Sequence, residues 1–169
     1  RALTHASDLD LIYLFDAPAG AQSDGPKALP ATDYYNRLES RIGAALGTPT
    51  AAGPLYDVDT RLRPQGAQGM LAVSLASFDQ YQRHEAWTWE HLALTRARIV
   101  SGRPAFAARV EKVIHDVLCR PRDAETIAGD VVEMRAAIAT EKGDAERWNL
   151  KYVKGGLVDL EFIAQYLQL

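Results

Sequence analysis

The segment from Asp8 to Phe15 constrains the fold most, because it predicts a β-strand with two unlike faces. Side chains alternate along a strand, so Asp8 and Asp10 project from the same face. The other face carries apolar and aromatic side chains: Leu9, Leu11, Tyr13 and Phe15. A face this apolar predicts a strand inside a sheet rather than at its edge. A carboxylate pair on such a strand needs a specific reason.

The rest of the sequence predicts a helix-rich chain around a few strands. One helix is expected from residue 32 or 33 to residue 45, and a long one over 74–98. Further strands are expected at 55–62, 69–74 and 149–154, and further helices at 106–117, at 127–138 and after residue 156. This order lacks the regular alternation of a doubly wound sheet and predicts an α+β fold. We expect a head with a mixed sheet at 1–101 and a helical region at 102–169, together a fragment of a larger protein.

Charge and composition disfavour several classes of function. The 169 residues carry 19 Lys and Arg against 22 Asp and Glu, and a net charge of -3 argues against nucleic-acid binding through bulk positive charge. No run approaches the roughly 18 apolar residues of a membrane span, so no membrane is expected as a partner. Cys119 is the only cysteine, which excludes an internal disulfide and a cysteine-based zinc site and suits a cytoplasmic location.

The carboxylates of Asp8 and Asp10 repel each other unless a cation lies between them or one of them is protonated. Mg²⁺ suits such a site, because it prefers one or two carboxylates together with water and substrate phosphates. Ser7, just before the pair, is small and would let a substrate approach. The alternative is a pair of solvent-exposed aspartates at a strand start, and the D-x-D pattern by itself favours that alternative.

The strand expected at 55–62 supplies more charged groups. Alternation gives one face the following side chains: Asp57, Asp59, Arg61 and Arg63. A carboxylate here would complete a three-acid site of the kind that holds two metal ions in phosphoryl transfer, and the arginines would hold phosphate oxygens. The alternative is a solvent-exposed face of Asp–Arg pairs, and the residues alone leave the two interpretations open.

Four segments together closely resemble the glutamine synthetase adenylyltransferase family, within the DNA polymerase β-like nucleotidyltransferase superfamily. They are residues 7–12 (S-D-L-D-L-I), 55–64 (L-Y-D-V-D-T-R-L-R-P), 85–91 (E-A-W-T-W-E-H) and 155–162 (G-G-L-V-D-L-E-F). They span essentially the whole chain in the right order, so the resemblance is more specific than any single D-x-D. The segment 85–91 looks like the C-terminal, adenylylating half of this bifunctional bacterial enzyme.

The resemblance implies transfer of AMP from ATP to a tyrosine of glutamine synthetase, with release of pyrophosphate. It implies two Mg²⁺ ions, with ATP as the substrate. Its implied site residues are Asp8, Asp10 and Asp59 as catalytic metal ligands, Asp57 as a lesser candidate, and Ser7, Arg61 and Arg63 as contacts to the nucleotide. One departure is that the glycine pair which the superfamily carries shortly before its D-x-D is absent from residues 1–7.

The resemblance also implies partners and leaves alternatives. Glutamine synthetase is the expected protein substrate, and a PII-type signal protein and glutamine are the expected regulators. One alternative is the deadenylylating half of the same enzyme, which removes AMP by phosphorolysis. The other is a non-catalytic module that docks on glutamine synthetase.

The helical segments carry two further expectations. Trp87 and Trp89 point about 200° apart on a helix, so we expect one of them to be buried. Glu161 is expected to pair with a basic residue such as Lys151 or Arg98.

Overall fold

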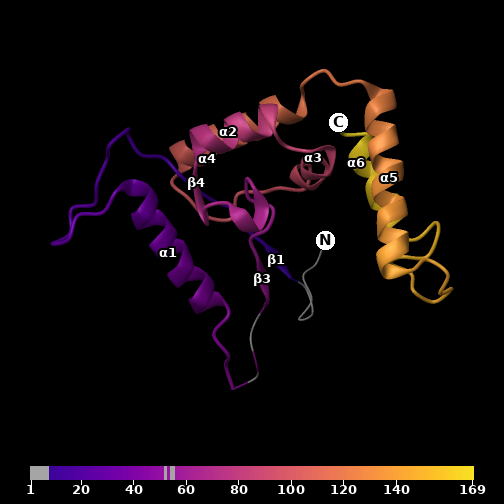
Figure 1. Cartoon of the computed structure of the whole chain (residues 1–169), viewed down its shortest axis with the longest axis horizontal. Helices are drawn as coiled ribbons and strands as arrows, with labels where there is room; N and C mark the ends of the chain where they lie inside the picture. The colour runs from indigo at the N-terminus through magenta and orange to yellow at the C-terminus, as the bar shows by residue number, and fades with distance from the viewer. Residues whose placement is uncertain (1–7, 52, 54–55) are drawn as a thin grey trace. The chain divides into compact units, whose positions relative to one another are not determined.

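A computed structural model of the chain describes residues 8–51, 53 and 56–169 (Figure 1). The chain divides into two compact units, one up to Gln82 and one from Arg83 to Leu169. The first combines four short strands with helices, and the second is helical in its described elements. The predicted α+β class is therefore confirmed.

The first unit is organised by two pairs of parallel strands. Strand β1 (Leu9–Asp10) pairs with β3 (Val58–Asp59), and β2 (Tyr13–Phe15) pairs with β4 (Ala72–Ser74). Parallel strands need a crossover connection, and helix α1 (Ala31–Leu46) lies in the segment that connects the two sides of each pair. Helix α2 (Leu75–His84) follows β4 directly and ends in the second unit.

Helix α1 packs against the β2–β4 pair through one ring and one amide. The ring of Tyr35 stacks on Phe15 with the ring centroids 4.5 Å apart. The Asn36 side-chain oxygen accepts hydrogen bonds from the backbone N–H groups of Leu71 (2.7 Å) and Ala72 (3.2 Å). Ala72 is buried, so leaving its N–H without an acceptor would lower the stability of the fold. Asn36 therefore fixes where β4 begins.

The second unit consists of four helices in its described elements: α3 (Thr88–Leu94), α4 (Pro104–Leu118), α5 (Ala124–Lys142) and α6 (Leu157–Tyr166). Its buried apolar side chains include Leu92, Val117 and Val158. Asp123 caps α5 by accepting a hydrogen bond from the backbone N–H of Thr126 (2.8 Å). None of the helices in the described part of the chain combines the length and apolar character needed to cross a membrane.

The strand predictions are only partly right. The strand expected over 8–15 is two separate strands, and within the described residues each strand has a single partner instead of lying inside a sheet. The strand expected at 55–62 is reduced to β3, with Leu55 outside the described residues. The mixed sheet is also wrong for the described strands, because both pairs join segments that run in the same direction.

Two other predicted elements are wrong for local reasons. The helix expected over 74–98 is interrupted, because the Glu90 carboxylate accepts a hydrogen bond from the backbone N–H of Trp87 (2.9 Å) and begins α3 anew. The segment 149–154 is a series of turns instead of a strand. Its turns close when the N–H groups of Tyr152 and Val153 donate to the carbonyl of Asn149, at 3.1 and 2.9 Å.

We expect Gly69→Ala to lower the free energy of unfolding by about 1–3 kcal/mol, because overpacking forces the backbone to shift. A Cβ at Gly69 would lie 2.0 Å from the carbonyl oxygen of Pro64, although the φ of -79° suits any residue. Gly129, inside α5, has open space around it, so Gly129→Ala should raise stability by about 0.5–1 kcal/mol. The free energies of unfolding of both variants, measured by urea denaturation, test the two predictions. An unchanged midpoint for Gly69→Ala would contradict the close approach.

Candidate functional site

The β1–β3 register brings carboxylates from two distant parts of the sequence onto one face. Asp10 lies opposite Asp59 in the parallel pair, and residues opposite each other in neighbouring strands project to the same side. The pairing is held by hydrogen bonds from the N–H of Leu9 to the carbonyl of Asp57 and from the N–H of Leu11 to the carbonyl of Asp59, both 2.8 Å. The predicted proximity of the two acidic segments is thereby seen in the backbone.

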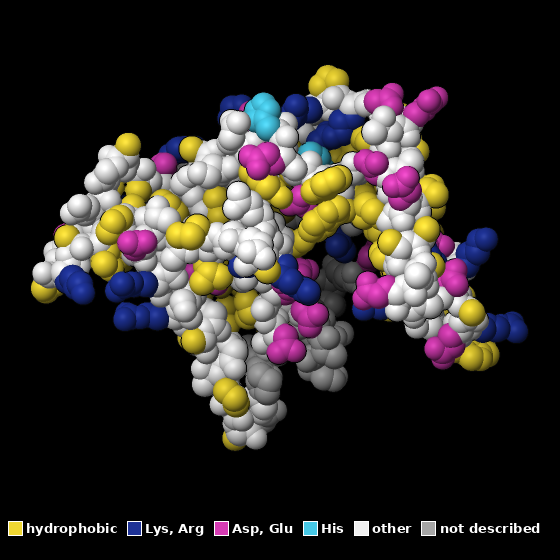
Figure 2. Space-filling view, viewed as in Figure 1, with side chains coloured by type: hydrophobic (Ala, Val, Ile, Leu, Met, Phe, Trp, Pro, Cys, Tyr) yellow, Lys and Arg dark blue, Asp and Glu magenta, His cyan; other side chains and the backbone are white. Residues whose placement is uncertain are grey.

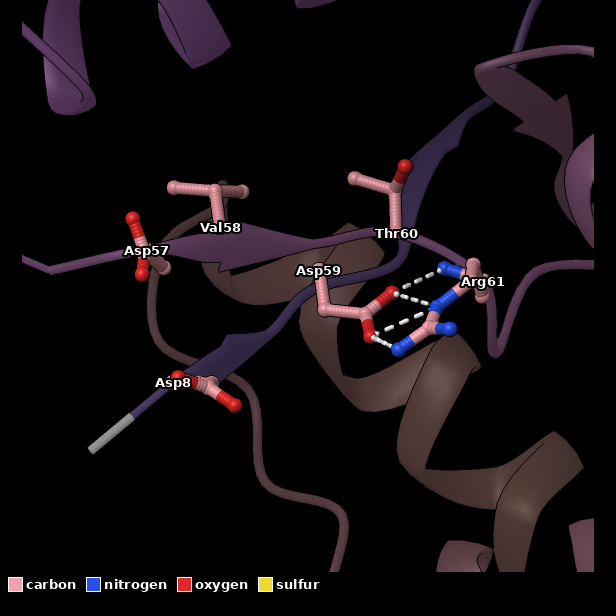
Figure 3. Close-up of a pocket in the computed structure, with 6 residues that line it drawn as sticks. All are labelled: Asp8, Asp57, Val58, Asp59, Thr60 and Arg61. Carbon is pink, nitrogen blue, oxygen red and sulfur yellow. Dashed lines mark hydrogen bonds and ion pairs between the residues drawn. The ribbon is translucent and has the colours of Figure 1, made fainter.

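An open pocket lies at this place, lined by Asp8, Asp57, Val58, Asp59, Thr60 and Arg61 (Figure 3). Figure 3 shows the Asp59 carboxylate turned toward Arg61, on the side of β3 opposite to Val58 and Thr60, with Asp8 just before the neighbouring strand β1. In the space-filling view, acidic side chains gather near the β1–β3 pair beside basic ones (Figure 2). Among the described residues, the pocket therefore has an anionic wall and one cationic side chain.

Arg61 is the cation of this pocket. Its backbone N–H donates to one Asp59 oxygen (2.8 Å), its Nε approaches both oxygens (3.0 and 2.8 Å), and its terminal Nη2 also contacts the carboxylate. These hydrogen bonds hold the pKa of Asp59 below its ordinary value, against the opposing effect of burial. The same contact raises the pKa of Arg61, and the charges of Asp10 and Asp8 add smaller effects in that direction. Arg61 thus neutralises part of the acidic face.

Arg63 lies apart from this pocket. Its residue surface is 6% exposed, and its guanidinium donates to the carbonyl of Thr60 (2.8 Å), the hydroxyl of Thr60 (2.8 Å), the carbonyl of Gly69 (3.2 Å) and the carbonyl of Ala67 (3.4 Å). The expectation that residues 57 to 63 alternate along one strand is wrong, because β3 ends at Asp59 and the chain then turns. The two arginines consequently occupy different environments.

The donor chemistry of the acidic face fits Mg²⁺, since carboxylate oxygens from two adjacent strands project to one side. Asp8 and Asp10 would be the holding pair. Asp59, the expected third ligand, is turned to Arg61. Among residues 8–51, 53 and 56–169, no group of three His, Cys, Asp or Glu side chains is arranged to hold a metal ion. A third carboxylate ligand would require Asp59 to exchange its guanidinium partner. Ser7 lies outside the described residues.

The remaining residues with expectations from the sequence lie in the helical unit. Trp87 and Trp89 are both largely solvent-accessible, at 71% and 41%, so the expected burial of one is wrong. Asp159 pairs with Arg135 and accepts a hydrogen bond from the N–H of Gly155. The expected pairing of Glu161 with a basic residue is confirmed, and the partner that the structure gives is Arg96, at 3.6 Å.

The sequence pattern does not predict the roles of Thr60 and Glu39. Thr60 lines the pocket and accepts from Arg63 through both its carbonyl and its hydroxyl. Glu39, on α1, is a buried carboxylate whose pKa is raised by burial and lowered to a smaller degree by the charge of Arg63. A buried acid in the middle of an exposed helical pattern carries no local signal, because its partner lies elsewhere in the sequence.

The fold and the site together define an α+β protein whose candidate site is a strand-borne group of carboxylates beside an arginine. The chain belongs to the glutamate-ammonia ligase adenylyltransferase family, whose sequence model matches residues 1–113. A bifunctional glutamine synthetase adenylyltransferase/adenylyl-removing enzyme of Rhodopseudomonas palustris strain HaA2 is 58% identical to it over 170 residues, and one of Bradyrhizobium diazoefficiens is 55% identical over 170. Each similarity covers 100% of this chain and 17% of the relative, so the chain spans about one sixth of the length of these relatives.

We expect Arg61→Met to raise the pKa of Asp59. The side-chain hydrogen bond from Arg61 lowers this pKa more than any other effect does, and the substitution removes it while burial, which raises the pKa, remains. A depressed folded-state pKa contributes stability that is present above the ordinary value of 3.8 and is lost as pH falls through the folded value. The variant should therefore lose less stability than the parent between neutral pH and acid. Carbon-detected NMR titration of the Asp59 carboxyl checks this, with Arg41→Met, an exposed change on α1, as the control. An unchanged Asp59 titration would show that the Arg61 contact is not formed in solution.

Proposed function

We propose that the chain carries the nucleotidyl-transfer site of a polymerase β-like nucleotidyltransferase head, and that it transfers AMP from ATP to a tyrosine of glutamine synthetase. The observation that carries the proposal is the register that sets Asp10 opposite Asp59, together with the pocket that Asp8 and Asp59 line. The relatives' shared name, which includes glutamine synthetase adenylyltransferase, supports the substrate and the group transferred. Two further parts of the proposal, the use of Mg²⁺ and a location in the cytoplasm, are predictions made from the sequence.

In this mechanism, Asp8 and Asp10 would hold Mg²⁺ together with the phosphates of ATP. When bound there, Mg²⁺ would supply charge stabilisation to the reacting phosphate. Asp59 would serve as a third ligand and help to remove the proton from the tyrosine hydroxyl. The tyrosine oxygen then bonds to the α-phosphorus as the bond from that phosphorus to the pyrophosphate oxygen breaks, and the protein's part is largely positioning and charge stabilisation.

Arg61 is the better placed of the two predicted phosphate contacts. Its side chain is 78% exposed and contacts the pocket, so it can turn from Asp59 to a phosphate oxygen by side-chain rotation alone. Arg63 would first have to give up four hydrogen bonds to the chain. We therefore assign the phosphate contact to Arg61.

A second candidate function is removal of AMP by phosphorolysis, because the name of the relatives includes an adenylyl-removing activity. That reaction would use the same acids: a phosphate oxygen bonds to the phosphorus of the tyrosine-linked AMP as the bond from that phosphorus to the tyrosine oxygen breaks, which forms ADP and frees the tyrosine hydroxyl. A PII-type protein and glutamine would act as regulators in either case. A non-catalytic docking module has no requirement for carboxylates set opposite each other on two strands.

We expect Asp10→Asn, in the natural polypeptide that carries this chain, to reduce AMP transfer by about 100-fold or more, since a lost metal ligand removes several kcal/mol of transition-state stabilisation. The assay follows label from the α-phosphate of ATP onto glutamine synthetase, and a parallel assay follows ADP release from adenylylated glutamine synthetase with phosphate. Asp24→Asn, an exposed loop change, is the matched control.

The two assays separate the candidate functions. Loss confined to label transfer supports adenylylation, and loss confined to ADP release supports deadenylylation. Near-normal rates for Asp10→Asn in both assays would refute a catalytic role for the acidic face.

A further inference from the structure

The loop after β3 is closed by a single buried guanidinium. Arg63 donates to the carbonyl and the hydroxyl of Thr60 at one end of the loop and to the carbonyl of Gly69 at the other, with a longer contact to Ala67 between them. Pro64, also buried, approaches Gly69 so closely that no Cβ would fit there. The loop therefore has one tightly specified conformation.

Thr60 is the residue between Asp59 and Arg61. Two of the four Arg63 hydrogen bonds end on Thr60, both at 2.8 Å. Fixing the carbonyl and the side chain of Thr60 limits how its two neighbours in the sequence are presented. Arg63 is thus coupled to the pocket through the backbone, although it does not line the pocket itself.

A buried guanidinium needs a compensating negative charge, since an unpaired charge out of water costs several kcal/mol. Glu39 of α1 is 5% exposed, and burial raises its pKa, while the charge of Arg63 acts on that carboxyl in the opposite direction and to a smaller degree. The charge of Glu39 on α1 therefore acts on Arg63 in addition to the four oxygen acceptors of its guanidinium.

We propose that Arg63 is a positioning residue, which clamps Thr60 so that Asp59 and Arg61 are presented to the acidic pocket. The inference rests on the proposed function, because it concerns the metal affinity of that pocket. This positioning role differs from the role of phosphate contact that the sequence predicts for Arg63, since a positioning residue affects metal binding even when no nucleotide is present. A phosphate contact affects nucleotide binding and leaves the affinity for metal alone intact.

The test is metal binding measured at the site itself, in the natural polypeptide and without nucleotide. Fe²⁺ with ascorbate and peroxide cleaves the backbone next to a divalent-metal site, and Mg²⁺ competes for the same place. Cleavage near residues 8–10 and 57–61, read by mass spectrometry, then gives an affinity for this site alone. Thermal unfolding of every variant shows whether it is folded.

We expect Arg63→Met to weaken metal binding about tenfold or more, the usual cost of losing a group that orients a metal ligand. Arg63→Lys, which keeps the charge without the planar fork, should recover part of the affinity. Thr60→Val removes one acceptor at nearly constant volume and should give a smaller loss in the same direction. Arg41→Met and Thr48→Val, exposed changes on or beside α1, should leave the affinity unchanged.

Each other outcome overturns the inference in a recognisable way. If wild-type protein shows no metal-dependent cleavage at the site, the proposed function fails and the inference fails with it. If wild-type protein is cleaved and a folded Arg63→Met keeps its metal affinity but loses affinity for ATP, Arg63 is a phosphate contact and only the inference fails. If Arg63→Met does not fold, full metal affinity in both Arg63→Lys and Thr60→Val likewise refutes the positioning role.

Discussion

The parallel register between β1 and β3 is the constraint on which the site depends. Each strand has two residues, yet their pairing sets Asp10 opposite Asp59 and joins segments separated by α1 and its loops. Two like charges 4 Å apart repel by about 1 kcal/mol in bulk water and about 4 kcal/mol near a protein surface. A register that gathers carboxylates is therefore stabilised by a cation nearby, and Arg61 supplies one in this structure.

The two arginines of the R-L-R sequence have different roles, because one is exposed and the other is buried. Arg61 is exposed and bound to one neighbour, so exchanging Asp59 for a ligand costs little. Arg63 is buried and bound to the chain at four acceptors, and hydrogen bonds from charged groups contribute about 1.5–3 kcal/mol each. The same type of side chain thus pairs with one carboxylate at an exposed position and binds four chain oxygens at a buried one, and burial decides which.

The sequence pattern predicted the strand-borne acids because alternation is a local property of the chain. It also predicted the helix that is now α1 to within about two residues at each end. It could not predict the register, which depends on pairing between remote segments. It misplaced Arg63 because alternation was extended past Asp59 into a turn, where Gln65 takes a left-handed φ of 62°. Glu39 and Asn36 look like ordinary helix-surface residues until their distant partners are known.

The Gly155–Gly156 segment shows how a sequence motif can be specified by packing and not by chemistry. A Cβ at Gly156 would lie 2.7 Å from the carbonyl oxygens of Leu150 and Val153, so glycine is required for the turn to close on itself. Asp159 then accepts from the N–H of Gly155 and pairs with Arg135 of α5, which also donates to the carbonyl of Tyr152 (2.8 Å). Because the carboxylate of Asp159 is engaged with these donors, this motif ties the 143–156 loop to α5. The candidate site lies elsewhere, where Asp10 and Asp59 lie opposite each other on two strands.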